Sequence, residues 1–249
     1  MEEVLKLADS KPRIICDVDG CLVPGRGSAW DFSGFSQLAK DIGTEEFGFT
    51  LCSGRPATFL EALARQLMIN QYCICENGAL LFHPLSKKGI IHPAVPKEFL
   101  QERARIQGVL EKLIAGTDVV IELGKDIMFS VNSSDKTMLE DLCTTIKEEL
   151  RNAPVVVVNS SRSIEVLPHG VNKAAGLRFW AEIEQVDFSQ ILSIGDADND
   201  LEILQAASTA AAPSNCTEMV RKTVDYVSNQ PMIQGVLDIC SQASSLIAR

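Results

Sequence analysis

Short apolar runs that alternate with helical patterns constrain the fold of this chain more than any other feature. In the first third, the apolar runs are residues 12–20, 47–54 and 72–78, and the helical patterns are residues 31–43 and 55–69. The last third repeats this order, with a helical pattern at 172–183 and an apolar run at 191–194. A regular succession of strand and helix is typical of a parallel sheet with helices on both faces. We therefore expect an α/β core.

The middle of the chain has a different order of expected elements: helix, two strands, helix, two strands. Apolar residues recur at helical spacing in two segments, which contain Phe99, Ile106, Leu110 and Leu113 and then Leu139, Leu142, Ile146 and Leu150. Residues 118–134 are expected to form a hairpin around Gly124, and residues 154–168 a second one. This order indicates an α+β module at 84–167, inserted into a core formed by residues 1–83 and 168–249.

The charge balance excludes several classes of partner. The chain has 33 acidic and 23 basic residues and a net charge of −10, whereas nucleic acids and anionic membranes attract positively charged surfaces. No apolar run approaches the roughly 18 residues of a transmembrane helix, and the first residues lack the apolar core of a signal peptide. We expect a cytoplasmic protein that acts on a small molecule and binds no nucleic acid and no membrane.

Polar residues follow the apolar runs at the points where strands are expected to end. Asp17 and Asp19 come directly after residues 14–16, and two carboxylates so close together repel each other unless a cation lies between them. Oxygen ligands of this kind suit Mg²⁺, which also binds phosphate oxygens. An aspartate-rich turn that holds no metal is the alternative interpretation.

Two further segments have the chemistry of a phosphate site. Ser53 and Gly54 follow the second run and precede a helical pattern, so a hydroxyl and backbone N–H groups lie at a helix N-terminus and can bind a phosphate. A plain helix cap is the alternative. Lys173 opens another helical pattern, where the helix dipole disfavours a cation unless an anion is nearby. The alternative for Lys173 is a lysine in solvent.

The fourth segment is GDADND at residues 195–200, which directly follows an apolar run. The spacing of its aspartates matches the first ligand positions of an EF-hand. Leu201 stands where an EF-hand needs glycine, however, and Ala207 where it needs glutamate. The segment is therefore not a calcium loop of that kind. Because the carboxyl ends of parallel strands meet at one edge of a sheet, we expect these segments to converge there.

Taken together, DVDGC (17–21), CSGR (52–55), NK (172–173) and GDADND (195–200) resemble, in order and context, the motifs of the haloacid dehalogenase-like (HAD) superfamily of phosphatases. The insertion resembles the type IIB cap of Cof-like sugar phosphatases, a group that includes sucrose-phosphate and mannosyl-3-phosphoglycerate phosphatases. The resemblance covers essentially the whole chain. It implies a Rossmann-like parallel sheet with helices on both faces and an inserted α+β cap that selects the substrate.

The resemblance also implies a role for each matching residue. Asp17 would be the nucleophile that forms an aspartyl-phosphate, and Asp19 would be the general acid and base. The ligands of Mg²⁺ would be Asp17, Asp19, Asp196 and Asp200. The phosphate would be bound by Ser53, Gly54, Lys173 and Asn199. Six residues could face the crevice and contact the rest of the substrate: Arg55, Asn77, Arg103, Arg105, Arg162 and Glu165. Arg55 and Asn77 are the better candidates, because they lie beside the core motifs at strand ends.

One position departs from the family pattern. Cys21 stands where the family usually has threonine. Because a thiol is a weaker hydrogen-bonding group than a hydroxyl, the loop around Asp17 is expected to be held less firmly. We expect this to affect the rate of the reaction and not its class.

These features predict a Mg²⁺-dependent phosphatase that acts on a small soluble phosphate ester, either a sugar phosphate or an acid such as phosphoglycerate or phosphoglycolate. A sugar phosphomutase or phosphotransferase that uses the same aspartyl-phosphate is an alternative. A non-catalytic binding protein with the HAD fold is a second alternative, from another class. The presence of Asp17, Asp19, Lys173 and Asp196 favours an enzyme over that binding protein.

Overall fold

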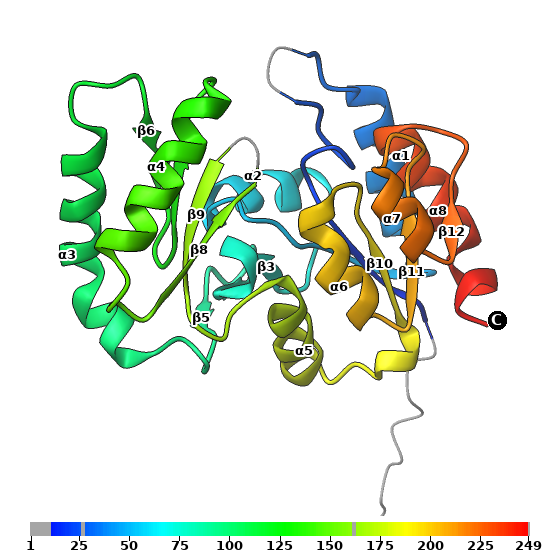
Figure 1. The fold of residues 1–249 in the computed structure, drawn as a ribbon. Helices are drawn as coiled ribbons and strands as arrows, with labels where there is room; N and C mark the ends of the chain where they lie inside the picture. Colours follow the sequence, from blue (N-terminus) through cyan, green and yellow to red (C-terminus); the bar gives the residue numbers. More distant parts are fainter. Residues whose placement is uncertain (1–10, 26–27, 161–162, 249) are drawn as a thin grey trace, which may run out of the picture. The chain divides into compact units, whose positions relative to one another are not determined.

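The computed structural model describes residues 11–25, 28–160 and 163–248, and the chain divides into two compact units (Figure 1). The first unit comprises Met1–Leu51, Ala64–Gln71 and Ala181–Arg249. The second comprises Cys52–Leu63 and Tyr72–Trp180. The whole predicted insertion, residues 84–167, lies within the second unit, together with segments on both sides of it. The boundaries of a cap at 84 and 167 stay a prediction.

The first unit is built on a five-stranded parallel sheet of order β12-β11-β10-β1-β2. Its strands are β1 (Arg13–Cys16), β2 (Gly48–Leu51), β10 (Ile191–Ile194), β11 (Thr209–Ala212) and β12 (Tyr226–Val227). The strands β1 and β10 are almost wholly buried and form the centre of the core. This sheet confirms the predicted parallel α/β core.

Two groups of helices pack on this sheet. One contains α1 (Phe32–Gly43) and α8 (Met232–Ile247), and the other contains α6 (Leu201–Ala206) and α7 (Glu218–Thr223). Both α8 and α6 contact β10 and β11. Two more helices, α2 (Ala57–Gln66) and α5 (Lys173–Glu184), include residues of both units. Within the described part of the chain, every helix is too short or too polar to cross a bilayer.

The third predicted strand belongs to a different sheet from the one expected. β3 (Cys73–Cys75) pairs antiparallel with β4 (Leu80–Phe82), which pairs with β5 (Gly89–Ile91), and β3 has only an isolated parallel bridge, to Cys52. The cause is the short helix η1 (Glu76–Gly78), in which all three residues have a positive φ. This left-handed turn reverses the chain directly after β3, so that the next strand runs back beside it.

The second unit also contains a four-stranded antiparallel sheet of order β6-β7-β9-β8. Its elements are β6 (Val120–Ile121), β7 (Phe129–Asn132), β8 (Val155–Asn159) and β9 (Ser163–Pro168), with the helices α3 (Lys97–Ile114) and α4 (Lys136–Glu149). Both predicted hairpins are confirmed by the pairing of β6 with β7 and of β8 with β9. The buried residues of the helices include Phe99, Ile106, Leu139 and Ile146, as the helical spacing predicted.

The two faces of this sheet differ in character. Arg103 of α3 places its guanidinium 4.5 Å from the centre of the Phe129 ring, so Phe129 points towards α3. Successive side chains of a strand point to opposite faces, and Ser130 therefore points away from that helix. Ser130 pairs with Glu165 across β7 and β9. Ser130 and Glu165 therefore share the face away from α3, together with Val158, the partner of Glu165 in β8.

Candidate active site

Asp17 is positioned by the parallel pairing of two buried strands. Cys16 and Ile194 are partners in the β1–β10 register, and the backbone N–H of Asp17 donates to the carbonyl of Ile194 at 2.8 Å. The chain then closes a tight loop, in which the N–H of Gly20 donates to the carbonyl of Val23 at 2.8 Å. Because both strands end at the same edge, the residues that follow them, Asp17 and Asp196, come together.

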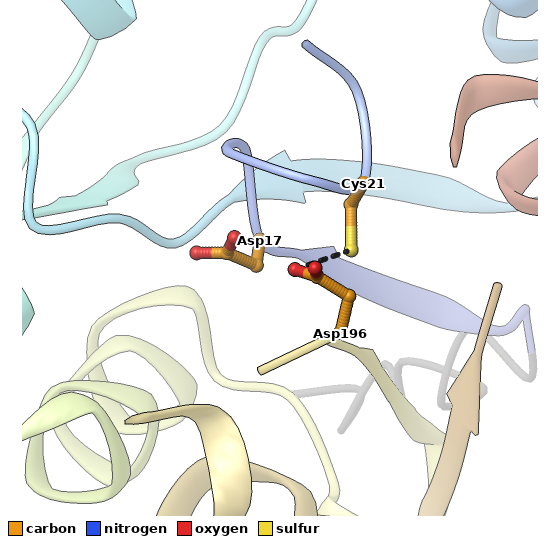
Figure 2. Close-up of side chains that lie close together, drawn as sticks. All are labelled: Asp17, Cys21 and Asp196. Atoms are coloured by element: carbon orange, nitrogen blue, oxygen red, sulfur yellow. Dashed lines mark hydrogen bonds between the residues drawn. The ribbon is translucent and has the colours of Figure 1, made fainter. Parts of the chain in front are cut away.

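Three side chains meet at this edge, and Figure 2 shows them. The potential ligand atoms of Asp17, Cys21 and Asp196 all lie within 4.8 Å of one another. The Cys21 thiol donates to Oδ1 of Asp196 at 3.8 Å, a distance that is acceptable for sulfur. Asp17 is 6% exposed and Cys21 is fully buried. Among the described residues, this is the group of acidic, histidine or cysteine side chains that is close enough to hold one metal ion.

The donor set fits a hard divalent cation. Mg²⁺ takes oxygen ligands, which the carboxylates of Asp17 and Asp196 supply, whereas thiolates favour softer metals. Burial raises the pKa of the Cys21 thiol well above its ordinary value, so this side chain stays protonated and acts as a hydrogen-bond donor. Gly20 has φ +94°, and a Cβ there would lie 2.2 Å from Oδ2 of Asp196. The missing side chain therefore leaves the space that the Asp196 carboxylate occupies.

Asp200 organises the loop that carries Asp196. Its side chain is fully buried, and its Oδ2 accepts from the backbone N–H groups of Asp196 and Ala197 at 3.1 and 3.2 Å. The group of three close ligands contains neither Asp200 nor Asp19, which is half-buried in the loop after β1. Their predicted roles as metal ligands stay predictions, and the contacts of Asp200 support a positioning role.

The same loop contains two residues with different surroundings. Asp198 had no predicted role, and its carboxylate accepts from the Thr217 hydroxyl at 2.6 Å. The backbone N–H of Thr217 donates to the carbonyl of Asp196 at 2.9 Å. Asn199 is exposed in the short helix η3 (Asp198–Asp200), and its binding of phosphate stays a prediction. Thr217 thus fixes the loop from the side of α7.

In the second unit, Ser53 and Gly54 are fixed against the turn of η1. The N–H of Ser53 donates to the carbonyl of Ile74 at 2.9 Å, and the N–H of Asn77 donates to the carbonyl of Ser53 at 3.1 Å. A Cβ on Gly54 would lie 3.1 Å from Oδ1 of Asn77, which is closer than side chains normally approach. The structure therefore brings together Ser53, Gly54 and Asn77, which were predicted to bind the phosphate and the substrate.

Lys173 is the first residue of α5 and is 3% exposed. This burial excludes the alternative of a lysine in solvent. The N-terminus of α5 packs on the same turn, because a Cβ on Gly78 would lie 2.4 Å from the carbonyl oxygen of Asn172. Lysine is seldom buried in proteins unless it is paired with an anion, so the position is consistent with the predicted phosphate contact.

A second buried lysine was missed by the sequence reasoning. The Lys125 side chain is 3% exposed, and its Nζ donates to the carbonyl of Gly54 at 2.8 Å and to the hydroxyl of Ser130. It also forms an ion pair with Glu122 at 3.1 Å, and Glu122 forms a second one with Arg55 at 3.3 Å. Lys125 belongs to no motif, and only the fold shows that it contacts the predicted phosphate-binding segment.

Other charged residues considered from the sequence have structural contacts. Arg103 donates to the carbonyls of Lys125 at 2.6 Å and Ile127 at 3.0 Å, so it holds the segment between β6 and β7. Arg105 forms an ion pair with Glu102 on the exposed side of α3. Arg162 lies outside the described residues. Arg103 and Arg105 therefore have partners within the second unit, on and beside α3.

Glu76 is a fully buried carboxylate that fixes the same segment. Its oxygens accept from the backbone N–H groups of Asp126, Ile127 and Met128 at 2.8, 2.8 and 3.0 Å. Burial raises the pKa of Glu76 above its ordinary value of 4.5, although the three hydrogen bonds and Lys125 lower it in part. Glu76 and Lys125 together bind the β6–β7 segment to the two loops that carry Ser53 and Asn77.

Replacement of this carboxylate gives a prediction on stability. Glu76→Gln should lower the free energy of unfolding by about 1–3 kcal/mol, because an amide cannot accept all three buried N–H groups. In the wild type, the raised pKa means that the folded state binds the proton more tightly than the unfolded state does. The free energy of unfolding should therefore decrease as the pH rises from about 4.5 through the raised pKa, and the variant should lack this decrease.

Urea unfolding over a pH series that starts at about 4.5 measures both effects, and Glu98→Gln, on the exposed side of α3, is the control. Parallel pH curves for the wild type and Glu76→Gln would show that Glu76 does not titrate with a raised pKa.

The chain is similar to known proteins over most of its length. The family model described as haloacid dehalogenase-like hydrolase matches residues 14–107 and 120–239. A phosphoglycolate phosphatase from Methanococcoides burtonii is 24% identical over 237 residues, which cover 93% of this chain and 96% of the relative.

Solved structures show the same fold over nearly the whole chain. A haloacid dehalogenase-like hydrolase from Bacteroides thetaiotaomicron has a TM-score of 0.73 at 19% identity and covers 93% of this chain and 99% of its own. The sucrose-phosphatase from Synechocystis sp. PCC6803, solved with sucrose and phosphate, has a TM-score of 0.65 at 17% identity. It covers 94% of this chain and 98% of its own. At these identities the likeness concerns the fold.

Proposed function

Because the chain belongs to the haloacid dehalogenase-like hydrolase family, we propose that it is a Mg²⁺-dependent phosphatase that hydrolyses a small phosphate monoester through an aspartyl-phosphate on Asp17. The observation that carries this proposal is the approach of the Asp17 and Asp196 carboxylates at the ends of β1 and β10. The phosphoglycolate phosphatase and the sucrose-phosphatase among the similar proteins support the same reaction class.

Asp17 attacks the phosphorus atom in line with the ester oxygen. The bond from phosphorus to the leaving oxygen breaks as the bond to an Asp17 carboxylate oxygen forms, and Asp19, as the general acid, gives a proton to the leaving alcohol. A water molecule then loses a proton to Asp19 and attacks the same phosphorus atom. This second step releases phosphate and restores the Asp17 carboxylate, so one hard hydrolysis is divided into two easier steps.

The charges of the site require a counter-charge. A phosphate dianion approaching Asp17, Asp196 and their neighbours would be repelled in a protein whose net charge is −10. Mg²⁺ held by Asp17, Asp196 and the Asp19 backbone, with Asp200 supporting the loop, would supply charge neutralisation. We assign the binding of the phosphate oxygens to the Ser53 hydroxyl, the Gly54 N–H, Lys173 and Asn199.

We propose further that residues 84–167 form a cap that selects the substrate and that residues 1–83 and 168–249 form the catalytic core. The β6–β7 segment of this cap contacts the predicted phosphate-binding residues through Lys125 and Arg55 through Glu122, and β9 contacts Asn77 through Glu165. These contacts support a role of the cap in recognising the group attached to the phosphate.

The proposal predicts metal-dependent release of phosphate. The full-length protein should release inorganic phosphate from p-nitrophenyl phosphate and from some members of a panel of sugar phosphates and phospho-acids in the presence of Mg²⁺. Chelation of the metal with EDTA should abolish this release, and re-addition of Mg²⁺ should restore it. Release that is unaffected by EDTA would contradict the metal assignment. Formation of an isomeric sugar phosphate without free phosphate would instead identify a mutase.

A further inference from the structure

Two glutamates lie in one row across the face of the four-stranded sheet that points away from α3. The N–H of Glu122 donates to the carbonyl of Ser130 at 2.8 Å, which continues the β6–β7 ladder by one residue, and Ser130 is the partner of Glu165 in the β7–β9 register. Residues that are directly opposite in antiparallel strands share a face. Glu122, Ser130 and Glu165 therefore point to the side of the sheet away from α3.

The predicted phosphate-binding segment lies against this same row. Lys125 connects Ser130 to the carbonyl of Gly54, Arg55 forms an ion pair with Glu122, and the side-chain amide of Asn77 donates to Glu165. Each of the three residues of the row is thus linked to a neighbour of Ser53: Glu122 to Arg55, Glu165 to Asn77, and Ser130 through Lys125 to Gly54. A group attached to a phosphate at Ser53 and Gly54 would consequently meet the carboxylates of Glu122 and Glu165.

The charges of Glu122 and Glu165 determine which chemical group can be bound next to the phosphate. Glu122 forms ion pairs with both Arg55 and Lys125, and Glu122 and Glu165 together balance the charges of these two cations. The Lys125 side chain is only 3% exposed. Glu122 is 23% exposed at its side chain, and Glu165 is half-buried. A carboxylate on the substrate would have to displace Glu122 from Arg55 and then lie near Glu165, which is unfavourable for like charges. A hydroxyl can donate to either glutamate and accept from Arg55 or Asn77.

We propose that Glu122 and Glu165 select phosphates of neutral polyols and disfavour phosphates that carry a carboxylate. This inference rests on the proposed phosphatase function and narrows its substrate class to one of the two that the sequence left open. The inferred preference differs from the substrate in the name of the Methanococcoides burtonii relative, because phosphoglycolate carries a carboxylate.

Matched pairs of substrates test this selectivity directly. Glycerol 3-phosphate and 3-phosphoglycerate differ only in a hydroxymethyl group against a carboxylate, and so do sorbitol 6-phosphate and 6-phosphogluconate. In at least one pair, we expect kcat/KM of the wild type to be at least about tenfold higher for the polyol phosphate than for the carboxylate. In neither pair should the carboxylate be the better substrate by this factor. Charged and neutral groups in a polar site are commonly discriminated to this extent. p-Nitrophenyl phosphate, which has neither group, is the reference.

Removal of the two negative charges should shift the selectivity. In Glu122→Gln/Glu165→Gln, KM for the polyol phosphates should rise about tenfold and kcat/KM for the carboxylates should rise, because the repulsion is gone. Each kcat/KM is divided by the value of the same variant for p-nitrophenyl phosphate, so that a general effect of the substitutions on the site cancels. The matched control is Glu148→Gln/Glu149→Gln, which removes two exposed charges from the end of α4. If the loss of the Glu122 ion pairs prevents folding, Glu165→Gln alone carries the same prediction.

The failures of the two proposals are distinguishable. If p-nitrophenyl phosphate is hydrolysed and the wild type prefers 3-phosphoglycerate or 6-phosphogluconate, or hydrolyses neither pair, the phosphatase assignment stands and the polyol inference is wrong. An unchanged selectivity in the folded double variant also overturns it. If no phosphate ester is hydrolysed, both proposals fail.

Discussion

Asp17→Asn is expected to lower kcat for phosphate release by roughly four to six orders of magnitude, the range found when single members of a catalytic triad are removed from an enzyme that uses covalent catalysis. An amide oxygen is a far weaker nucleophile than a carboxylate, and the substitution hardly changes the volume of the side chain. The fold should be retained. In EDTA the Tm should be no lower than that of the wild type, because Asp17 and Asp196 lie close together and their charges repel each other without a cation.

Rapid quenching of the reaction with a substrate labelled at the phosphorus atom detects the aspartyl-phosphate intermediate directly. The wild type should retain label on the protein and Asp17→Asn should not. Asp141→Asn, an exposed position on α4, is the control for the general effect of losing one carboxylate. Turnover of Asp17→Asn close to that of the wild type would refute the assignment of the nucleophile.

Gly20→Ala is expected to weaken Mg²⁺ binding about 10–100-fold, the range typical for changes that displace a metal ligand without removing it. A Cβ at this position would lie 2.2 Å from Oδ2 and 2.6 Å from Cγ of Asp196, so the carboxylate must move. The backbone of Gly20 also has φ +94°, and a left-handed conformation costs a residue with a side chain about 1–2 kcal/mol. Activity at saturating substrate should need correspondingly more Mg²⁺.

Titration of activity with Mg²⁺ and calorimetric titration of the metal both measure this change. The matched control is Gly108→Ala in α3, where a Cβ meets nothing within 4 Å. That variant should bind Mg²⁺ as the wild type does and be slightly more stable, because alanine favours helix more than glycine by about 1 kcal/mol. Equal metal affinity of Gly20→Ala and the wild type would show that Asp196 is not a ligand.

Elements that depend on local pattern were predictable from the sequence. The helices α3 and α4 follow from apolar residues at helical spacing, and the hairpin of β6 with β7 follows from alternation around Gly124. The proximity of Asp17 and Asp196 was also predictable, because each lies within two residues of the end of an apolar strand of one parallel sheet. These features need only short-range information and one general rule on where parallel strands end.

Features that depend on long-range pairing were not predictable in the same way. An apolar segment such as Cys73–Cys75 can pair with a parallel or an antiparallel strand equally well. The left-handed turn at Glu76–Gly78 decides between the two kinds of pairing. The Cys21 thiol contacts Asp196, 175 positions away, through the curvature of one tight loop. Lys125 belongs to no sequence motif, and only its contacts with Gly54 and Ser130 connect it to the predicted phosphate-binding segment.

The sequence by itself determined the α/β class, because the class follows from local periodicity. An insertion between the second and third motifs and the residues of the site were predicted in the same way, from local patterns and short motifs. Only the tertiary structure decided which side chains share a face. The row of Glu122, Ser130 and Glu165 exists because three strands pair in one register, and a shift of one residue would turn Glu165 to the other side. Register is fixed by packing between segments that are distant in the sequence.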